Sequence, residues 1–130
     1  MIRTVGLSHV SLSVRDPEVS IDFYTRLLGV REYARDERTI QALGPGEHDV
    51  LVFERREGSG KRGGIDHFGF RLAAPEDIDD AIATAEAVGA KILRTGEFEP
   101  GLPYLYLEDP DGHMIEIWYE PATFGGAGGN

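Results

Sequence analysis

Cysteine is absent from the 130-residue sequence, and basic residues are scarce: 13 lysines and arginines stand against 23 aspartates and glutamates. The lack of cysteine excludes disulfides, thiolate metal sites and a cysteine nucleophile, and it favours a reducing compartment, the cytoplasm. The formal net charge of -10 repels phosphate backbones and anionic lipid surfaces. We therefore expect no nucleic-acid partner.

Long apolar runs are also missing. No stretch approaches the roughly 18 apolar residues that a membrane span needs, and the first residues, MIRTVGLSHVSLSV, contain no apolar core of a signal peptide. We expect a cytoplasmic protein with no membrane partner. The 41% of hydrophobic residues that are present suffice for one core, so one domain is expected.

The sequence contains an internal repeat. GLSHVSLSVRDPE (6–18) and GIDHFGFRLAAPE (64–76) match at a constant offset, which places His9 at the position of His67. Both segments alternate between apolar and polar residues, as half-buried strands do. The match indicates internal duplication.

Each opening strand leads into a helix with proline in its first turn, Pro17 in one copy and Pro75 in the other. Gly29 and Gly89 are expected to end the two helices, because glycine readily adopts the left-handed backbone conformation. Three extended segments follow each helix, so each copy is predicted to be a βαβββ module. The segments are 30–35, 39–44 and 49–55 in the first copy, and 90–96, 102–108 and 113–120 in the second.

The domain organisation follows from this repeat. The modules are predicted to span about 3–56 and 64–120 within a single domain, 1–123. The glycine-rich basic stretch 57–63 is typical of a solvated linker, and 124–130 is typical of a flexible tail.

The turn sequence DPDG (109–112) predicts the register of the last hairpin. Its proline at the second position and its glycine at the fourth fit a type I turn followed by a left-handed residue. Counting outward from the turn places Tyr106 opposite Glu116 and Tyr104 opposite Trp118. These four side chains share one face of the hairpin, and the isoleucines beside Glu116 point to the other.

Glu116 lies between Met114 and Trp118 on this face, which indicates partial enclosure, and an enclosed carboxylate needs a partner. A metal ion is one such partner. With the matched histidines, His9 and His67, the carboxylate makes up a facial triad that binds Fe(II), Mn(II) or similar cations and leaves positions for substrate. The alternative is a salt-bridged Glu116 with two independent histidines; the duplication favours the triad.

A fourth ligand is not evident in the first module. In the alignment that matches His48 with His113, Leu51 stands where the second module has Glu116. Leucine supplies no ligand atom. His48 and Asp49 lie close enough for a bulge to bring one of them in, although each is more typical of a turn residue.

The segments LSHVSLSVRDPEVSIDFYTRLLG, DHFGFRL and YLYLEDPDGHMIEIW resemble the vicinal oxygen chelate (VOC) superfamily. This superfamily includes glyoxalase I, methylmalonyl-CoA epimerase, extradiol dioxygenases, and fosfomycin- and bleomycin-resistance proteins. The resemblance implies an α+β fold in which paired βαβββ modules form a curled mixed sheet around a metal cleft. It also implies a homodimer and one divalent metal ion held by His9, His67 and Glu116. These ligands favour Fe(II) or Mn(II), and Zn(II), Ni(II) and Co(II) are also compatible.

Within the superfamily, the resemblance favours extradiol-dioxygenase chemistry on a small aromatic or enolisable compound. Three protein ligands suit these enzymes, and YLEDPDGHMIE resembles the C-terminal half of their signature. That match implies a catalytic Tyr106 that donates a hydrogen bond or a proton to a substrate oxygen. The upstream histidine of the signature, expected near 95–99, is missing. The expected substrate-binding residues are Ser11, Tyr104, Met114 and Trp118.

Other activities stay open. Lyases or isomerases of the glyoxalase and epimerase type use four protein ligands, so Leu51 counts against them. A drug-sequestering protein of the bleomycin-resistance type needs no metal, and an acidic protein suits a cationic drug. A fosfomycin-type transferase shares the three ligands and the Ser11 hydroxyl, but the last strands offer Arg94 and little else to hold a phosphonate.

Overall fold

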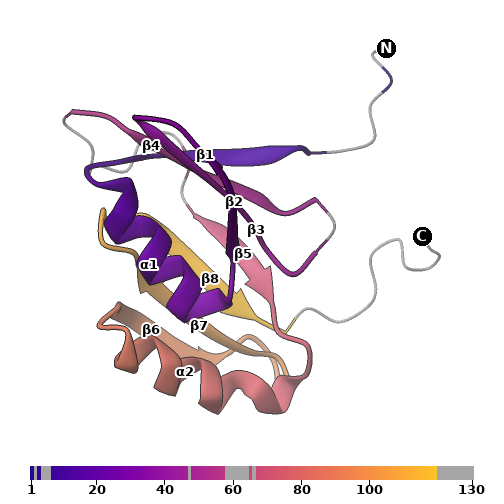
Figure 1. The fold of residues 1–130 in the computed structure, drawn as a ribbon. Helices are drawn as coiled ribbons and strands as arrows, with labels where there is room; N and C mark the ends of the chain where they lie inside the picture. The colour runs from indigo at the N-terminus through magenta and orange to yellow at the C-terminus, as the bar shows by residue number, and fades with distance from the viewer. Residues whose placement is uncertain (2, 4–6, 47, 58–64, 66, 120–130) are drawn as a thin grey trace. The chain divides into compact units, whose positions relative to one another are not determined.

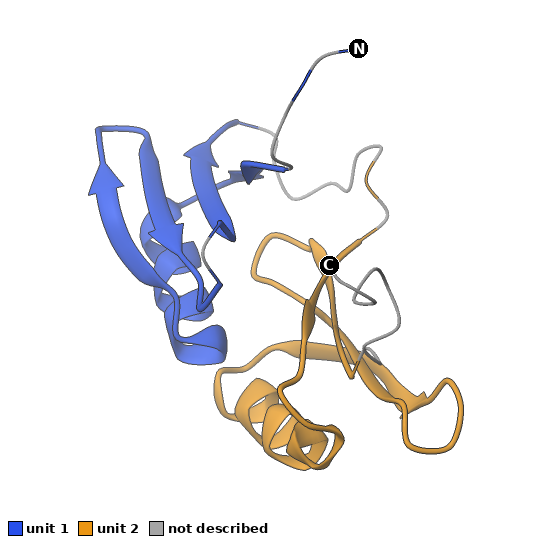
Figure 2. Ribbon diagram, turned by 90° about the vertical axis from the view of Figure 1, so that its right-hand side faces the viewer, with its two compact units in different colours: residues 1–61 blue, residues 62–130 orange. Residues whose placement is uncertain are grey.

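Two compact units, residues 1–61 and residues 62–130, make up the chain (Figure 1, Figure 2). The predicted tail and all but the first residue of the predicted linker lie outside the described residues. Within the part of the chain that is described, no helix is long and apolar enough to cross a membrane. The computed structural model describes residues 1, 3, 7–46, 48–57, 65 and 67–119.

Unit 1 is a four-stranded mixed sheet with one helix packed on it. The strand order is β1-β4-β3-β2, in which β1 and β4 run parallel and the other neighbours run antiparallel. Helix α1 packs on β3 and β4. The elements are β1 (His9–Val14), α1 (Pro17–Leu28), β2 (Arg31–Arg35), β3 (Thr39–Leu43) and β4 (Val50–Arg55).

Unit 2 repeats this arrangement with the strand order β5-β8-β7-β6 and with α2 packed on β6 and β7. The predicted α+β class with two βαβββ modules is therefore confirmed, and each module forms its own mixed sheet. The elements are β5 (Phe68–Arg71), the short 3-10 helix η1 (Pro75–Asp77), α2 (Ile78–Ala87), β6 (Lys91–Glu97), β7 (Pro103–Glu108) and β8 (Met114–Trp118).

The predicted helix ends are confirmed for α1 and for the end of α2, whereas Pro75 opens the 3-10 helix η1 and α2 itself begins only at Ile78. At the start of α1, the Asp16 carboxylate accepts a hydrogen bond from the Glu18 N–H at 3.0 Å, and Pro17 occupies the first turn, where its missing N–H costs nothing. Gly29 and Gly89 follow the two helices with φ values of 72° and 76°, in the left-handed region that glycine tolerates.

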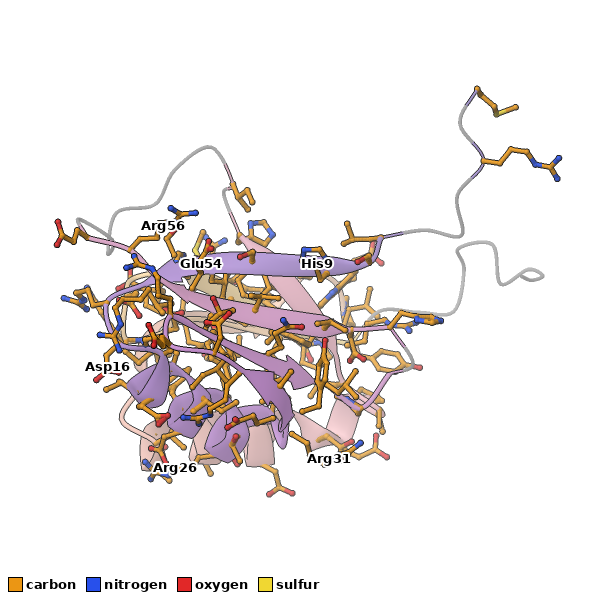
Figure 3. All side chains as sticks on the ribbon, turned by 45° about the horizontal axis from the view of Figure 1, so that its top comes forward. His9, Asp16, Arg26, Arg31, Glu54 and Arg56 are labelled. Carbon is orange, nitrogen blue, oxygen red and sulfur yellow. The ribbon has the colours of Figure 1, made fainter. Side chains whose placement is uncertain are left out.

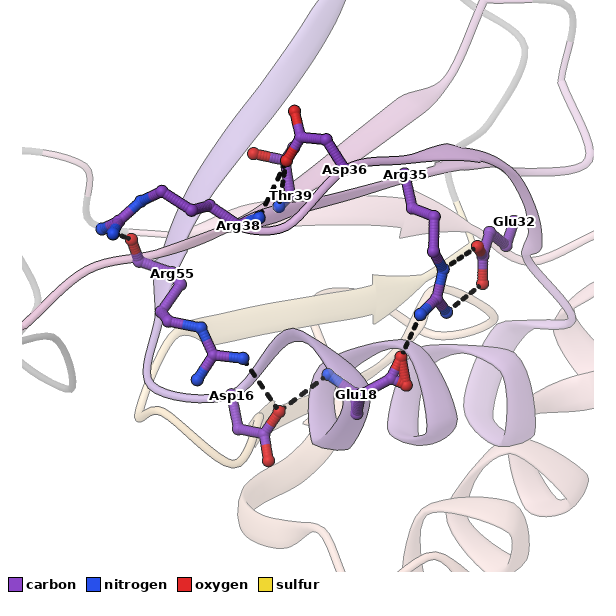
Figure 4. A network of polar contacts seen from close by, with 8 residues as sticks. All are labelled: Asp16, Glu18, Glu32, Arg35, Asp36, Arg38, Thr39 and Arg55. Carbon is purple, nitrogen blue, oxygen red and sulfur yellow. Dashed lines mark hydrogen bonds and ion pairs between the residues drawn. The ribbon is translucent and has the colours of Figure 1, made fainter.

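A polar network links the start of α1 to β2 and β4 (Figure 4). Arg35 on β2 pairs with Glu18 on α1 at 2.6 Å and with Glu32 on its own strand at 2.8 Å. Arg55 on β4 approaches the Asp16 carboxylate at 3.9 Å. The arginine side chains are about half-exposed, so these pairs orient the helix start and add little to stability.

The β7–β8 hairpin has the predicted register. Tyr106 lies opposite Glu116, and Tyr104 lies opposite Trp118. The turn is closed as in a type I turn, because the Gly112 N–H donates a 3.0 Å hydrogen bond to the Asp109 carbonyl. Gly112 itself has a φ of 86°, as expected for a left-handed position.

Unit 1 corrects one expectation, because Val52, and not Leu51, occupies the position that Glu116 has in unit 2. Val52 lies opposite Ser11 on β1, and Glu116 lies opposite Gly69 on β5. Ser11 and Gly69 are themselves matched positions of the two opening strands. Leu51 is a core residue, 4% exposed. Neither valine nor leucine carries a ligand atom, so this position still supplies no fourth ligand.

A difference in loop length explains the error. Residues 44–49 join β3 to β4, and residues 109–113 join β7 to β8, so the loop of unit 1 is one residue longer. The repeat offset therefore changes across this loop: Leu43 matches Glu108 before it, and Val50 matches Met114 after it. The longer loop contains His48 and Asp49, and the Asp49 carboxylate accepts a hydrogen bond from the Gly46 N–H at 2.9 Å.

Candidate functional site

His67 and Glu116 lie together in unit 2. His67 immediately precedes β5, Glu116 lies in the middle of β8, and His67 Nε2 is 3.2 Å from Glu116 Oε1. The flanking Ile115 and Ile117 are buried in the core, so strand alternation directs the carboxylate to the opposite face of the sheet. The Glu116 side chain is 12% exposed, so this face is partly enclosed, as the sequence indicated.

The spacing of these two donor atoms fits two ligands of one metal ion. Atoms that lie about 2.1 Å from a metal and at right angles around it are about 3 Å apart. An imidazole nitrogen and a carboxylate oxygen suit first-row divalent ions. Among the described residues, no three His, Asp or Glu side chains gather into a metal-binding group. The third predicted ligand, His9, belongs to unit 1.

Gly69 leaves room for the Glu116 side chain. A Cβ atom at Gly69 would lie 3.0 Å from the Glu116 main-chain oxygen and 3.4 Å from the Glu116 Cβ, so a neighbour would have to shift. Sequence reasoning did not assign Gly69 to the site. The repeat contained a signal for it: Gly69 in the second copy matches Ser11 in the first, and the change to glycine marks a position without a side chain.

Tyr106 contacts His67 and lies opposite Glu116. The Tyr106 and His67 rings meet edge to face with their centroids 5.5 Å apart, and the tyrosine is 8% exposed. Burial, followed by the hydrogen bond and the negative charge of Glu116, raises the pKa of Tyr106, while Arg94 acts in the opposite direction. These influences favour the neutral phenol, whose single O–H donates toward the Glu116 carboxylate.

An aromatic cluster continues from Tyr106 along the same face. The Tyr104 ring is 5.5 Å from the Tyr106 ring and stacks on Phe98 at 4.3 Å. Phe98 in turn meets Trp118 edge to face at 5.7 Å. Two of the predicted substrate-binding residues, Tyr104 and Trp118, are thus joined by Phe98, which sequence reasoning missed because it lies outside the alternating segments.

A cavity of about 330 Å³ opens beside Tyr106. Tyr106 and the predicted substrate-binding residue Met114 line this space together with His67. Leu93 and Arg94 complete the lining. Sequence reasoning noted Arg94 as an available cation and missed Leu93.

The remaining predicted site residues, His9 and Ser11, lie on β1 of unit 1. Figure 3 labels His9 on this strand. Both are exposed and alternate with the buried Leu12 and Val14, as the sequence pattern predicted. The Ser8 hydroxyl is hydrogen-bonded to His9 Nδ1 at 2.6 Å. A joint role of His9 with His67 and Glu116 stays a prediction.

Two βαβββ units with a histidine at the start of each, and a glutamate beside the second histidine, define a protein of the glyoxalase and dioxygenase fold class. A model of the Glyoxalase/Bleomycin resistance protein/Dioxygenase superfamily matches residues 6–117, and the chain belongs to this family. The predicted VOC resemblance is confirmed.

Relatives within the family carry different activities. The chain is 28% identical, over 86% of its length, to the manganese-dependent 2,3-dihydroxybiphenyl 1,2-dioxygenase of Geobacillus genomosp. 3, and it spans only 36% of that protein. It is 28% identical, over 84% of its length, to a probable lactoylglutathione lyase of Vibrio cholerae, of which it spans 86%. The crystal structure of a glyoxylase/bleomycin resistance protein/dioxygenase domain from Frankia sp. EAN1pec aligns with a TM-score of 0.75 and 28% identity, covering 90% of this chain and 98% of that one.

Proposed function

We propose that this protein is a divalent-metal enzyme whose substrate chelates the ion through two neighbouring oxygens. Ring cleavage of a small aromatic or enolisable compound is the favoured reaction. The observation that carries the proposal is the 3.2 Å approach of His67 Nε2 to Glu116 Oε1, with the ring of Tyr106 against His67. His9 is the proposed third ligand. Fe(II) and Mn(II) are the favoured ions, and the dioxygenase relative from Geobacillus is named as manganese-dependent.

A bound divalent ion supplies Lewis-acid stabilisation of a chelated catecholate or enolate. The side chains around it orient the substrate and move protons. Tyr106 donates a hydrogen bond to the substrate oxygen next to Glu116, or gives its proton to that oxygen and regains one from solvent. Leu93 and Met114 make part of the cavity wall apolar, which suits the ring or carbon frame of a substrate.

A glyoxalase-type lyase is the second candidate. The lactoylglutathione lyase relative supports it, because the chain spans most of that protein. The VOC resemblance implies four protein ligands for such enzymes, whereas Val52 stands at the position equivalent to Glu116 and has no ligand atom. We therefore rank this activity below ring cleavage.

Metal content tests the proposal. Protein expressed with iron, manganese, nickel and zinc supplied is expected to retain close to one equivalent of metal, measured by elemental analysis. Less than about a tenth of an equivalent, with no uptake on reloading, would overturn the enzyme proposal and favour a drug-sequestering protein that works without metal.

Oxygen consumption then separates the reactions. Metal-loaded protein is incubated with a panel of catechols in an oxygen electrode, and ring cleavage is followed by the absorbance of the opened product. Turnover with oxygen uptake supports the dioxygenase. Turnover of an enolisable substrate without oxygen uptake supports the lyase or isomerase instead.

A further inference from the structure

We propose that Arg94 binds an anionic group of the substrate, a carboxylate or a related oxyanion, beside the metal-chelating end. This inference deepens the proposed function and rests on it for the identity of the chelating end. The anion-binding part of the inference can be tested on metal-free protein.

A β-bulge directs Arg94 toward the cavity. Ile92 pairs with Leu107 and Arg94 pairs with Tyr106, so Leu93 is an extra residue between them. In a regular strand, Ile92 and Arg94 would share the core face. The extra residue moves Arg94 to the face that carries Tyr106, which is how bulges re-aim side chains beside functional sites.

The guanidinium of Arg94 is held by two aromatic rings. Its carbon lies 4.9 Å from the ring centre of Tyr106 and 5.6 Å from that of Tyr104. Packing against rings fixes the cation without using all of its five N–H donors. Arg94 also lines the cavity of about 330 Å³, so its donors can be reached by a bound molecule.

Within the described residues, no carboxylate forms an ion pair with Arg94, whereas Arg35, Arg55 and Arg56 of unit 1 each have at least one carboxylate partner. This difference is notable in a chain with 23 acidic and 13 basic residues. Arg94 lies over the ring of Tyr106, its partner across β6 and β7, and this contact leaves the charge of the guanidinium unpaired. The charge of Arg94 is therefore available to an anion that enters the cavity.

Tyr106 lies between Arg94 and Glu116 in the register of the sheet. It pairs with Arg94 across β6 and β7 and with Glu116 across β7 and β8. A molecule that chelates through neighbouring oxygens near Glu116 therefore has Arg94 two strands away on the same face, about 10 Å between backbones. The cavity volume is near the lower end of the range for small-molecule sites. A single ring with an acidic substituent is the class of compound that fits.

The single tryptophan of the chain provides a direct assay. Trp118 contacts Phe98, which stacks on Tyr104, and Tyr104 packs against Arg94, so tryptophan fluorescence reports on this cluster. Metal-free protein is titrated with benzoate, benzenephosphonate and neutral benzamide. We expect benzoate to bind at least about 10-fold more tightly than benzamide, because a charge-assisted hydrogen bond forms only with the anion. Tighter binding of benzenephosphonate than of benzoate would assign the phosphonate type of oxyanion.

Variants identify the residue responsible. Arg94→Gln is expected to weaken benzoate binding at least about 10-fold and to leave benzamide binding unchanged, whereas Arg94→Lys should lose less because the charge remains. Lys91→Gln, which removes the same charge from the same strand outside the cavity, should behave as wild type. Equal binding of benzoate and benzamide by wild type, or undiminished benzoate binding by Arg94→Gln, would overturn the proposal.

Metal binding, measured on the same proteins by calorimetry, keeps the two proposals separate. Arg94→Gln is expected to bind Mn(II) as wild type does. A wild-type protein that prefers benzoate but binds no metal would overturn the proposed function and leave Arg94 as an anion site. A protein that binds metal but shows no anion preference would overturn the role of Arg94 alone.

Discussion

In each sheet, the face opposite the helix carries different side chains in the two units, although the strands of the two sheets are paired in the same way. Each unit has a bulge in its outer strand, at Tyr33 in β2 and at Leu93 in β6, followed by the same pairing across the sheet. The three matched positions hold Ala34, Gln41 and Val52 in unit 1 and Arg94, Tyr106 and Glu116 in unit 2. The two units thus share the same backbone frame, and at these three positions only unit 2 carries ionisable side chains.

The two cores differ as well. In unit 1, Tyr24 packs on Phe53 with ring centres 5.0 Å apart, and the small Ala42 lies on the neighbouring strand. In unit 2, Leu107 replaces this alanine and Ile117 replaces the phenylalanine at the matched positions. A large aromatic residue and a small residue on neighbouring strands of unit 1 thus correspond to two aliphatic residues of intermediate size in unit 2.

The largest expected effect is on metal binding. Glu116→Gln keeps the size of the side chain but removes the charged ligand, so we expect Mn(II) affinity to fall at least about 100-fold in calorimetric titrations. Val52→Gln, at the matched position of unit 1, should retain affinity close to that of wild type. Equal losses in the two variants would contradict the difference between the units.

Truncations of core side chains test whether the two units unfold in a single transition. Phe53→Ala should lower the free energy of unfolding by about 3–5 kcal/mol and Ile117→Ala by about 2–5 kcal/mol, measured by urea denaturation. If residues 1–123 form one domain, both variants will shift a single transition. Two transitions, each sensitive to one variant, would show that the units unfold separately. Val19→Ala, on the exposed side of α1, serves as a control.

A smaller effect is expected at Gly69, where the added methyl group of Gly69→Ala would crowd Glu116. We expect about 1–3 kcal/mol of destabilisation by overpacking and a roughly 10-fold loss of metal affinity. Ser11→Ala changes the matched residue of unit 1, which already has a Cβ, so its free energy of unfolding should stay at the wild-type value. If Gly69→Ala changed neither the free energy of unfolding nor the metal affinity, the Glu116 side chain would not depend on the space at Gly69.

The smallest expected effect is at alkaline pH, where Tyr106 titrates and its unit 1 counterpart, Gln41, does not. Because burial and Glu116 raise the folded-state pKa of Tyr106, its contribution to stability is complete below the ordinary tyrosine pKa of about 10 and is lost as the pH rises through the folded value. Metal-free wild type should therefore lose more unfolding free energy than Tyr106→Phe between about pH 9 and pH 11. Equal losses in urea denaturation would exclude a raised pKa.

Local signals in the sequence predicted most of the fold. Alternation, the prolines at positions 17 and 75 and the glycines at positions 29 and 89 act within a few residues, so strands and helix ends could be located. The DPDG turn likewise predicted that Tyr106 faces Glu116. The position of Leu51 was wrong because a constant repeat offset cannot detect one inserted loop residue.

Parts of the site depend on packing between distant segments and could not be predicted. Nothing in KILRTGE marks Leu93 as the extra residue of a bulge, so simple alternation assigns Arg94 to the wrong face. Phe98 joins the aromatic cluster because the chain returns from β6 into β7, which its residue type does not reveal. The role of His9 as a third ligand beside His67 and Glu116 depends on such packing and stays a prediction. The homodimer stays a prediction as well.

The bulge at Leu93 also bears on how this protein can diversify. The backbone of Leu93 is outside the paired register of β6 and β7, yet its side chain lines the cavity. We therefore expect a change of residue size there to alter the cavity while the pairing of Ile92 and Arg94 is kept. If the proposed function holds, position 93 is the first position to randomise in a directed-evolution library that aims at a new substrate range.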